Sequence, residues 1–215
     1  LIEMWKSWYR GNVDDFHYYN VKLADGSTAA CERLTMNMPK KVAEDYAKLI
    51  WSEKVQIKLD SDDKTALLWS VLDSKENNFS TVFPQFIEKT FALGGGALVE
   101  YLVDGEPRID YLTADNVIPF AQENEKVTGF ISLSQFKEGF GKKVYYYTLL
   151  TFHEFKGGKY IKYNELYKSK NESDLGKQTN FNTMFPEVPE LMEYETDTPH
   201  FQFIKPNIAN NNDLN

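Results

Sequence analysis

The chain of 215 residues is poor in cysteine and has no long hydrophobic run. Its single cysteine, Cys31, excludes an internal disulfide and leaves a cysteine-based zinc site without further thiolate ligands. The longest uncharged apolar stretches, such as 130–133 and 148–152, are far shorter than the roughly 20 residues that cross a bilayer. The first ten residues show no basic segment followed by an apolar one, as a secretory signal would. The sequence therefore predicts neither a disulfide framework nor a membrane span.

Basic residues are also in deficit, with 24 Lys and Arg against 32 Asp and Glu, for a net charge of −8. Residues 1–136 carry −7 and residues 171–215 carry −6, whereas residues 137–170 hold 8 basic and 3 acidic side chains. Tight sequence-neutral DNA binding needs many Lys or Arg contacts to phosphates, so the overall balance disfavours a clamp on nucleic acid. Lysines of the basic stretch fit the solvent side of strands, where they blunt an exposed edge.

Aromatic side chains are abundant: Phe, Tyr and Trp make up 15% of the chain. Hydrophobic residues at 42% and charged residues at 26% are typical of a folded globular domain. The length predicts one domain, or one domain with an appendage, and large side chains of this kind dominate cores and interfaces.

Three helices are predicted between residues 39 and 93. Apolar residues recur at helical spacing in 39–53, after Ser61 and from Phe79 onward, with Asn37, Ser61 and Ser80 as candidate caps. Gly94 can end the last helix. A short strand is expected between the first two helices, over 55–59.

After Gly96 the apolar period changes to two, which predicts an antiparallel β-meander over about 97–168. Asp104-Gly105 and Gly157-Gly158 are typical hairpin turns. Helices followed by consecutive strands predict an α+β fold, with N-terminal helices packed on the meander in one domain, residues 1–168. Residues 169–215 are expected to be an extended acidic and polar segment, mostly loop, with a brief returning strand at 200–204.

No pattern points to catalysis, a cofactor or a metal. Gly94-Gly95-Gly96 runs from a helix into a strand and lacks the Lys-Ser/Thr of a nucleotide loop, so it fits helix termination. The three histidines share no ligand spacing and fit structural roles. The pairs Asp14-Asp15 and Asp62-Asp63 fit turn and helix-start chemistry, although folding could bring carboxylates together in a small hydrolase.

The basic stretch interleaves rings with lysines, as on surfaces where single-stranded nucleic acid stacks. Alternation turns about half of these rings inward, so core packing accounts for most of them. A separate binding module for single-stranded nucleic acid or carbohydrate therefore stays open as an alternative function.

Four segments together resemble the N-terminal half of portal proteins of tailed bacteriophages, of the class found in siphophages of Gram-positive hosts. They are Trp5 with Trp8-Tyr9-x-Gly11 and Phe16-His17; Met38-Pro39-Lys40-Lys41-Val42-Ala43-Glu44-Asp45-Tyr46-Ala47 with Glu53-Lys54-Val55-x-Ile57; Gly94-Gly95-Gly96-Ala97; and Phe203-x-Lys205-Pro206-Asn207-x-Ala209-Asn210. The segments span nearly the whole chain.

The resemblance implies a structural subunit of a ring, normally of twelve copies, at the capsid vertex in the virion. Such rings are assembled in the bacterial host cytoplasm with scaffold and capsid protein, dock the large terminase subunit and later hold the head-tail adaptor. Double-stranded DNA passes through the channel without tight binding, and the family has no enzymatic activity or cofactor. This chain corresponds to the outer, wing-like part, and the stem and the terminase-contacting region are expected beyond Asn215.

Ring closure requires two different patches on each subunit. The basic stretch facing the acidic remainder of a neighbour would supply them, and this predicts a subunit-contact patch at Lys142, Lys143 and Lys162.

Overall fold

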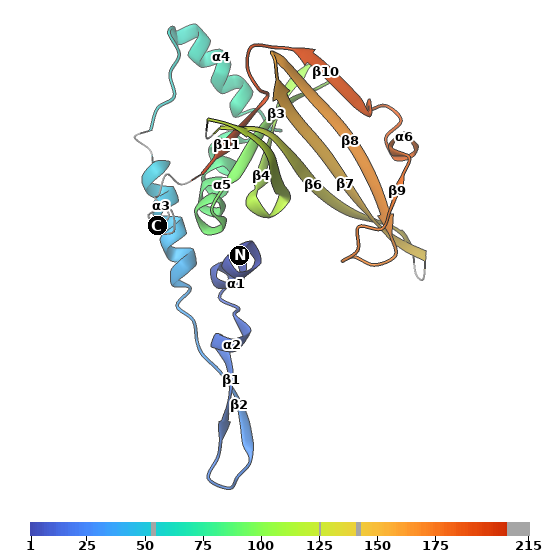
Figure 1. Ribbon diagram of the computed structural model, residues 1–215. Coiled ribbons are helices and arrows are strands. Elements are labelled where there is room, and N and C mark those ends of the chain that lie inside the picture. Colours follow the sequence, from blue (N-terminus) through green and yellow to red (C-terminus); the bar gives the residue numbers. More distant parts are fainter. Residues whose placement is uncertain (53–54, 125, 141–142, 206–215) are drawn as a thin grey trace. The chain divides into compact units, whose positions relative to one another are not determined.

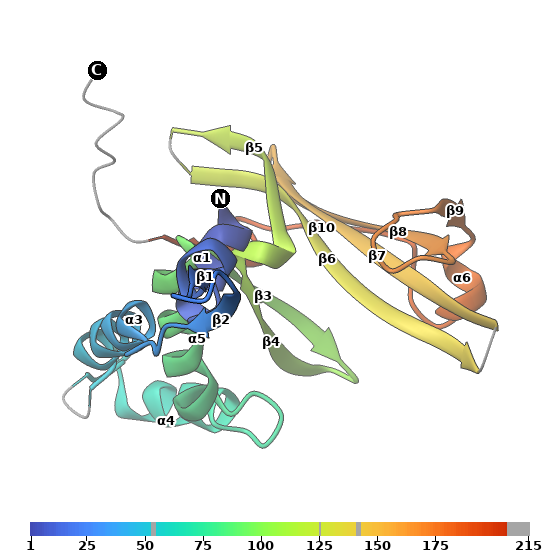
Figure 2. The same cartoon turned by 90° about the horizontal axis from the view of Figure 1, so that it is seen from below.

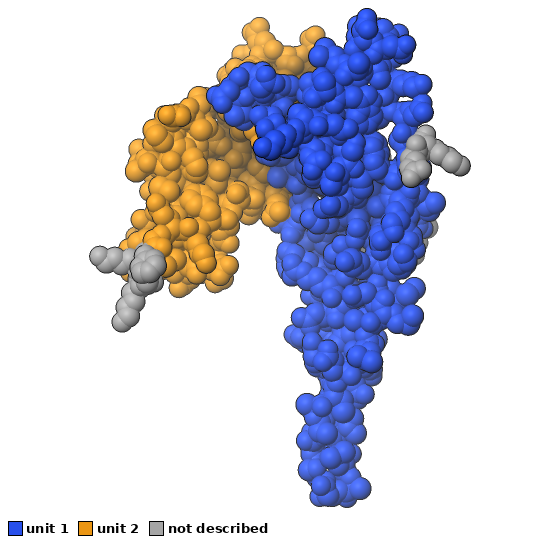
Figure 3. Space-filling model, turned by 180° about the vertical axis from the view of Figure 1, so that it is seen from behind, with its two compact units in different colours: residues 1–96, 102–115, 204–215 blue, residues 97–101, 116–203 orange. Residues whose placement is uncertain are grey.

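The computed structural model describes residues 1–52, 55–124, 126–140 and 143–205 (Figure 1). The chain divides into two compact units (Figure 3): unit 1 comprises residues 1–96, 102–115 and 204–215, and unit 2 comprises residues 97–101 and 116–203. Each unit is thus assembled from separate stretches of sequence, and the chain passes between them four times.

Unit 1 contains the helices of the N-terminal half. Their bounds are α1 Ile2–Arg10, α2 Asp14–His17, α3 Met38–Ile50, α4 Asp62–Leu72 and α5 Phe79–Leu93. The long helices α3, α4 and α5 confirm the three predicted from apolar spacing. Ser61 caps α4 as predicted, because its side chain accepts a hydrogen bond from the Lys64 backbone N–H at 3.3 Å.

At the other two predicted caps, Asn37 and Ser80, the structure differs from the prediction. Asn37 precedes α3 in the left-handed conformation, at φ 51°, and its side chain makes no capping bond. Ser80 lies inside α5, which begins one residue earlier at Phe79. The Ser80 N–H and hydroxyl both donate to the Asp73 carboxylate, at 2.9 and 2.8 Å, so Asp73 at the end of α4 satisfies the start of α5.

The short strand predicted over 55–59 is wrong: these residues form no strand. A β-strand needs a neighbouring strand to satisfy its backbone groups, and the alternating apolar residues of this segment have none beside them. Instead, the segment is tied to α4: the Trp69 indole N–H donates to the Ile57 carbonyl at 3.2 Å, and the Leu59 N–H donates to the Thr65 hydroxyl at 2.9 Å.

The core of unit 1 lies between α3 and α5. Ala43 and Ala47 on α3 and Phe86 and Ile87 on α5 are buried. Small alanine side chains let the two helices approach closely. At the end of α3, Trp51 meets Phe79 and Phe83 edge to face, with centroids 5.4 and 5.2 Å apart.

A hairpin that sequence patterning did not predict precedes α3. Strands β1 (Tyr18–Lys22) and β2 (Thr28–Glu32) pair antiparallel and project away from the helices of unit 1 (Figures 1 and 3). We call residues 18–32 the arm.

Unit 2 is built on a six-stranded antiparallel sheet with strand order β10-β8-β7-β6-β5, in which β9 also pairs with β8 (Figure 2). The bounds are β5 Val117–Glu123, β6 Lys126–Phe140, β7 Lys143–Lys156, β8 Lys159–Ser169, β9 Lys177–Thr179 and β10 Leu191–Glu195. Consecutive pairing of β5 through β8 confirms the predicted meander, and Gly157 and Gly158 both adopt positive φ at the β7–β8 turn.

One face of this sheet carries the core of unit 2. Phe130 is fully buried and stacks on His153, at a centroid distance of 4.6 Å. Farther along the sheet, Tyr147 and Leu166 bury Phe181 of the short helix α6 (Phe181–Met184). Alternation along the strands turns the remaining side chains to the opposite face.

Strands β3 (Gly96–Val103) and β4 (Glu106–Thr113) form a separate three-stranded sheet with β11 (Phe201–Ile204), in the order β11-β3-β4. The β3–β4 turn has positive φ at both Asp104 and Gly105, 52° and 82°, as a two-residue hairpin turn requires. A 3-10 turn, η1 (Ala114–Asn116), follows β4.

The predicted α+β fold, with helices and an antiparallel β-meander, is confirmed. Residues 169–205 are richer in regular structure than predicted, because β9, α6 and β10 lie there, and the predicted returning strand at 200–204 is confirmed as β11. The proposed boundary between a domain of residues 1–168 and a following segment stays a prediction. Within the described ranges, no helix is long and apolar enough to cross a membrane.

Candidate subunit-contact surfaces

Of the lysines in the predicted patch, Lys143 and Lys162 lie in described strands, and their backbones are far apart on the sheet. Lys142 lies outside the described residues, and Lys143 begins β7. Lys162 is in register with His153, ten positions farther along β7, or about 33 Å at 3.3 Å per residue. The Lys162 ammonium lies over the Tyr101 ring, 5.8 Å from its centroid. A contact role for these lysines stays a prediction.

The rings of the basic stretch are largely engaged within unit 2. Tyr147 and Tyr160 are buried, as alternation predicted for about half of these rings. The Lys168 ammonium lies over Tyr145 and Tyr147, at 4.1 and 5.3 Å from their centroids. Such cation–π contacts use the ring faces on which a nucleic-acid base would have to stack.

His153 belongs to a closed polar network inside unit 2. Its Nδ1 lies 2.6 Å from the Tyr160 hydroxyl, and its Nε2 lies 3.3 Å from the Ser132 hydroxyl. Burial, helped by the positive charge of Lys162, lowers the pKa of His153 to about 3. A neutral ring that is 3% exposed and stacked on Phe130 can fix the sheet but cannot reach a substrate.

The other histidines hold local structure. Buried His17 accepts a hydrogen bond from the Val13 N–H through Nδ1, at 2.9 Å. His200 lies 2.7 Å from the Glu100 carboxylate. Among the described residues, no three His, Cys, Asp or Glu side chains gather closely enough to hold a metal ion.

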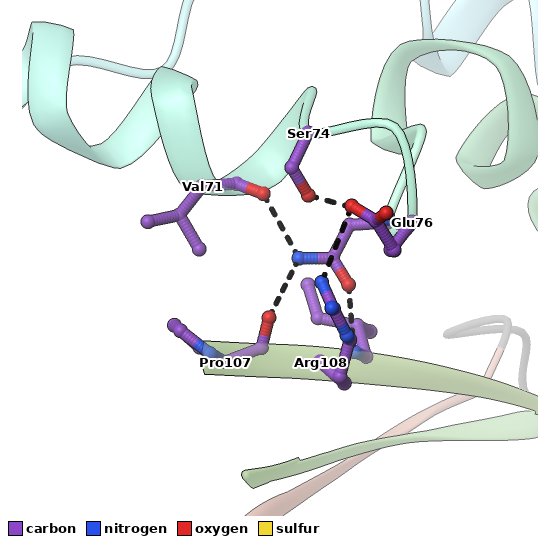
Figure 4. Close-up of polar contacts among 7 residues, drawn as sticks. Val71, Ser74, Glu76, Pro107 and Arg108 are labelled. Atoms are coloured by element: carbon purple, nitrogen blue, oxygen red, sulfur yellow. Dashed lines mark hydrogen bonds and ion pairs between the residues drawn. The ribbon is translucent and has the colours of Figure 1, made fainter. Parts of the chain in front are cut away.

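The side chain of Asn77 makes a set of buried polar contacts in unit 1, and two of its partners, Val71 and Pro107, are labelled in Figure 4. Its side-chain amide donates to the carbonyls of Val71 and Pro107, at 2.9 and 3.0 Å, and its amide oxygen accepts from the Ile109 N–H at 3.1 Å. The residue is 2% exposed. Asn77 therefore ties the corner between α4 and α5 to β4.

The arm has one polar and one apolar face. Its register pairs Tyr19 with Cys31 and Val21 with Ala29, and alternation places these four side chains on one face. The opposite face carries Tyr18, Asn20, Lys22, Thr28, Ala30 and Glu32. All five residues of β1 are exposed, and Tyr19 and Val21 keep 41% and 39% of their surface accessible. The β1 side of the apolar face is thus exposed, and Ala29 and Cys31 on the β2 side are half-buried.

A backbone hydrogen bond and several ring contacts fix the base of the arm. The Arg33 N–H donates to the His17 carbonyl at 2.7 Å, which extends the pairing beyond β1 and β2. The Arg33 guanidinium lies over the rings of Phe16 and Tyr19, 4.9 and 5.0 Å from their centroids. Trp8 of α1 packs on Phe16 at 5.1 Å.

Helix α3 presents a second open apolar surface. Met38, Val42, Tyr46 and Leu49 follow at helical spacing and are 54%, 48%, 50% and 77% exposed. Ala43 and Ala47, each one position farther along the helix, are buried, and the Tyr46 ring stacks on Phe91 of α5 at 5.2 Å. We call these four exposed side chains the α3 stripe.

The third apolar surface is the face of the six-stranded sheet opposite the core. The strand registers align Ile131 with Phe152, Leu133 with Leu150, and Phe152 with Tyr163. These five side chains, here called the apolar sheet face, are all half-buried. A one-sided antiparallel sheet normally carries polar residues on its second face, so apolar residues there indicate a covering partner.

None of these surfaces has the enclosure or convergent polar groups of a substrate site. An open hollow of unit 2 at the β7–β8 turn is lined by Gly157, Gly158, Lys159, Glu195, Thr196 and Asp197. Flat apolar faces and a projecting hairpin are instead the means by which proteins bind other proteins.

Comparison with known protein families gives one match over almost the whole chain. A family model described as phage portal protein, SPP1 Gp6-like, matches residues 1–214. No curated protein matches the chain.

Proposed function

Because the chain belongs to the SPP1 Gp6-like family of phage portal proteins, we propose that it is a structural subunit of a ring at the capsid vertex, through which the genome enters and leaves. The family match over residues 1–214 carries this proposal. The exposed and half-buried apolar surfaces of the two units support it, since a ring subunit must bury such surfaces against neighbours.

The finer features of the role follow from the same proposal. The ring, of twelve subunits, forms the DNA channel during packaging, docks the terminase and the head-tail adaptor, and is assembled with scaffold in the host cytoplasm. The described residues belong to its outer, wing-like part. A net charge of −8 suits a surface along which DNA slides, because it offers few phosphate contacts. The proposed role is structural and involves no enzymatic activity.

The basic stretch is a further part of the proposal. Lys143 and Lys162, together with Lys142, would meet acidic surfaces of the next subunit and guide association. Attraction between unlike charges acts over about 10 Å at 0.1 M salt. Each lysine can therefore attract an acidic surface of the neighbour separately, without contact between the lysines.

Ring formation by the full-length protein tests the proposed function. Native mass spectrometry and negative-stain electron microscopy should show closed rings of one subunit number. A protein that stays monomeric across a range of concentration and ionic strength would contradict the proposal.

A further inference from the structure

The arm is a well-formed hairpin whose apolar face is incompletely covered. An isolated two-stranded hairpin is marginally stable in water and needs a third strand or another packed element. Residues Tyr19, Val21, Ala29 and Cys31 would supply the contact, yet Tyr19 and Val21 stay exposed and Ala29 and Cys31 are only half-buried. Because the arm projects from the helices of unit 1, its own helices do not provide the cover (Figures 1 and 3).

The tip of the arm is ordered by its own hydrogen bonds. The Leu23 N–H donates to the Ser27 carbonyl at 2.8 Å. Asp25 Oδ1 accepts from both the N–H and the hydroxyl of Ser27, at 2.9 and 2.6 Å. Gly26 takes the positive φ of 84° that the turn requires. With its base fixed by Arg33 and His17, the arm can present a preformed face to a partner at little entropic cost.

The proposed ring makes a second copy of the chain the natural partner. Contact between two arms would be isologous and would stop at a dimer, whereas a ring needs the arm to meet a different surface of the next subunit. The chain offers two such surfaces, the α3 stripe and the apolar sheet face.

Shape and charge both favour the apolar sheet face. A flat two-stranded ribbon packs face to face on a sheet, about 10 Å apart, whereas a helix offers only a narrow convex stripe. Between Asp14 and Arg33, the arm and its base hold four acidic and two basic side chains. Residues 137–170, which include the end of β6 and the whole of β7 and β8, hold 8 basic and 3 acidic side chains. The arm and the strands that carry the apolar sheet face thus have opposite net charge.

Resting on the proposed ring function, we infer that the apolar face of the arm of one subunit packs on the apolar sheet face of the neighbouring subunit. Tyr19, Val21 and Cys31 then lie against Leu133, Leu150 and Phe152 of that neighbour. The arm acts as a clasp between subunits, and each subunit gives one arm and receives another around the ring.

Cys31 provides a direct probe of this contact. In the full-length protein, maleimide labelling of Cys31, followed by peptide mass spectrometry, should be at least about tenfold slower in rings than in dissociated subunits, since thiol reactivity requires exposure. The matched control is Thr28→Cys in a Cys31→Ser background. Residue 28 lies on the polar face of the same strand and should label at nearly equal rates in both states.

Cross-linking tests which surface receives the arm. In rings carrying Leu133→Cys, a bismaleimide with a spacer of about 10 Å should join residue 133 to Cys31 of the next subunit and give a ladder of covalent multimers, because stacked sheets lie that far apart. Leu49→Cys on the α3 stripe is the control and should give no ladder.

The outcomes separate this inference from the proposed function. Rings in which Cys31 labels as fast as residue 28 in the control, or in which only Leu49→Cys gives a ladder, would overturn the clasp while leaving the portal role intact. Failure of the unmodified protein to form rings at all would instead contradict the proposed function.

Discussion

At the scale of single residues, the Asn77 side chain connects the corner between α4 and α5 to strand β4 through hydrogen bonds to three backbone groups. Its two donated bonds and one accepted bond are all within 3.1 Å. The salt bridge from Arg108 to Glu76, at 3.5 Å, lies beside them and is partly open to solvent (Figure 4). Such an exposed ion pair contributes little to stability compared with the buried amide.

Asn77→Ala should lower the free energy of unfolding by about 3 kcal/mol, because it removes three hydrogen bonds and leaves buried backbone groups unpaired. Urea unfolding followed by tryptophan fluorescence and circular dichroism measures this change. Asn20→Ala, on the polar face of the exposed arm, is the control and should change stability by less than about 0.5 kcal/mol. Equal effects of the two substitutions would show that the Asn77 contacts do not support unit 1.

His153 should make the protein less stable in mild acid. Its folded-state pKa of about 3 lies below the ordinary value of 6.5, so between these values the unfolded chain binds a proton that the folded chain does not. This contribution to stability is fully present above pH 6.5 and is lost as the pH falls, by up to about 1.4 kcal/mol per pH unit.

His153→Phe isolates this effect because it keeps a ring on Phe130 and removes the titrating group. The variant should be less stable at pH 7, since it leaves the buried Tyr160 hydroxyl without its partner, and its stability should fall less between pH 7 and pH 5. Unfolding free energies at the two pH values measure both changes. An equally steep fall in the variant would assign the acid sensitivity to other groups.

Sequence reasoning could not identify either of these residues as special. Asn77 follows Glu76 in a polar stretch between two helices, which indicates a loop, and its burial depends on β4, some 30 residues later. The structural role of His153 was predicted, but its Tyr160 partner was not, because their contact depends on the exact register of β7 with β8.

At the scale of elements, the Gly94-Gly95-Gly96 run ends α5 and starts β3, as the sequence predicted. Gly94 has φ 83°, and an added Cβ would approach the Trp5 ring at 3.0 Å. At Gly96, a Cβ would come within 2.8 Å of the Leu112 carbonyl and the Phe86 ring. Glycine here serves close packing of α5, β4 and α1 as well as the turn.

Gly94→Ala should destabilise the protein by about 1–2 kcal/mol, through strain at positive φ and the contact with Trp5. Gly105→Ala is a matched control, since Gly105 has φ 82° and no atom within 4 Å of an added Cβ. Thermal unfolding should therefore show a larger loss for Gly94→Ala. If both variants lose the same stability, the Trp5 contact contributes nothing.

Elements with two independent signals were predicted well. Helix α4 has both an apolar period and a Ser61 cap, and β3–β4 has alternation together with the Asp104-Gly105 turn. The prediction of a strand at 55–59 rested on alternation alone, and it was wrong because no described strand pairs with this segment. The arm was missed because its two five-residue strands carry weak alternation, and nothing within its own sequence covers its apolar face.

At the scale of the whole molecule, the sequence could predict that wide apolar contact surfaces exist, but not which residues form them. The high aromatic content predicted wide contact areas, but the side chains that stay open were fixed by the fold. Alternation alone could not tell which face of β6 to β8 would be covered by Phe181. Lys143 and Lys162, chosen from charge clustering, lie far apart because Lys162 of β8 pairs with His153, ten residues along β7 from Lys143.

Reversing Lys142, Lys143 and Lys162 to Glu should weaken ring assembly at low salt, and the defect should shrink at high salt, where charges are screened. Analytical ultracentrifugation at several ionic strengths measures it. The control triple variant reverses Lys58, Lys64 and Lys75, which are exposed in unit 1, and produces the same net charge. Unchanged assembly of the first variant, or equal weakening of both, would remove the lysine patch from the proposed function.

The interleaved construction of the two units has a consequence for how the protein responds to proteases. Since the chain passes between the units at four places, one cut in a surface loop between residues 116 and 203 leaves two fragments that each hold segments of both units. A nicked subunit should therefore remain a single particle until denatured, and neither unit can be released by trimming one linker.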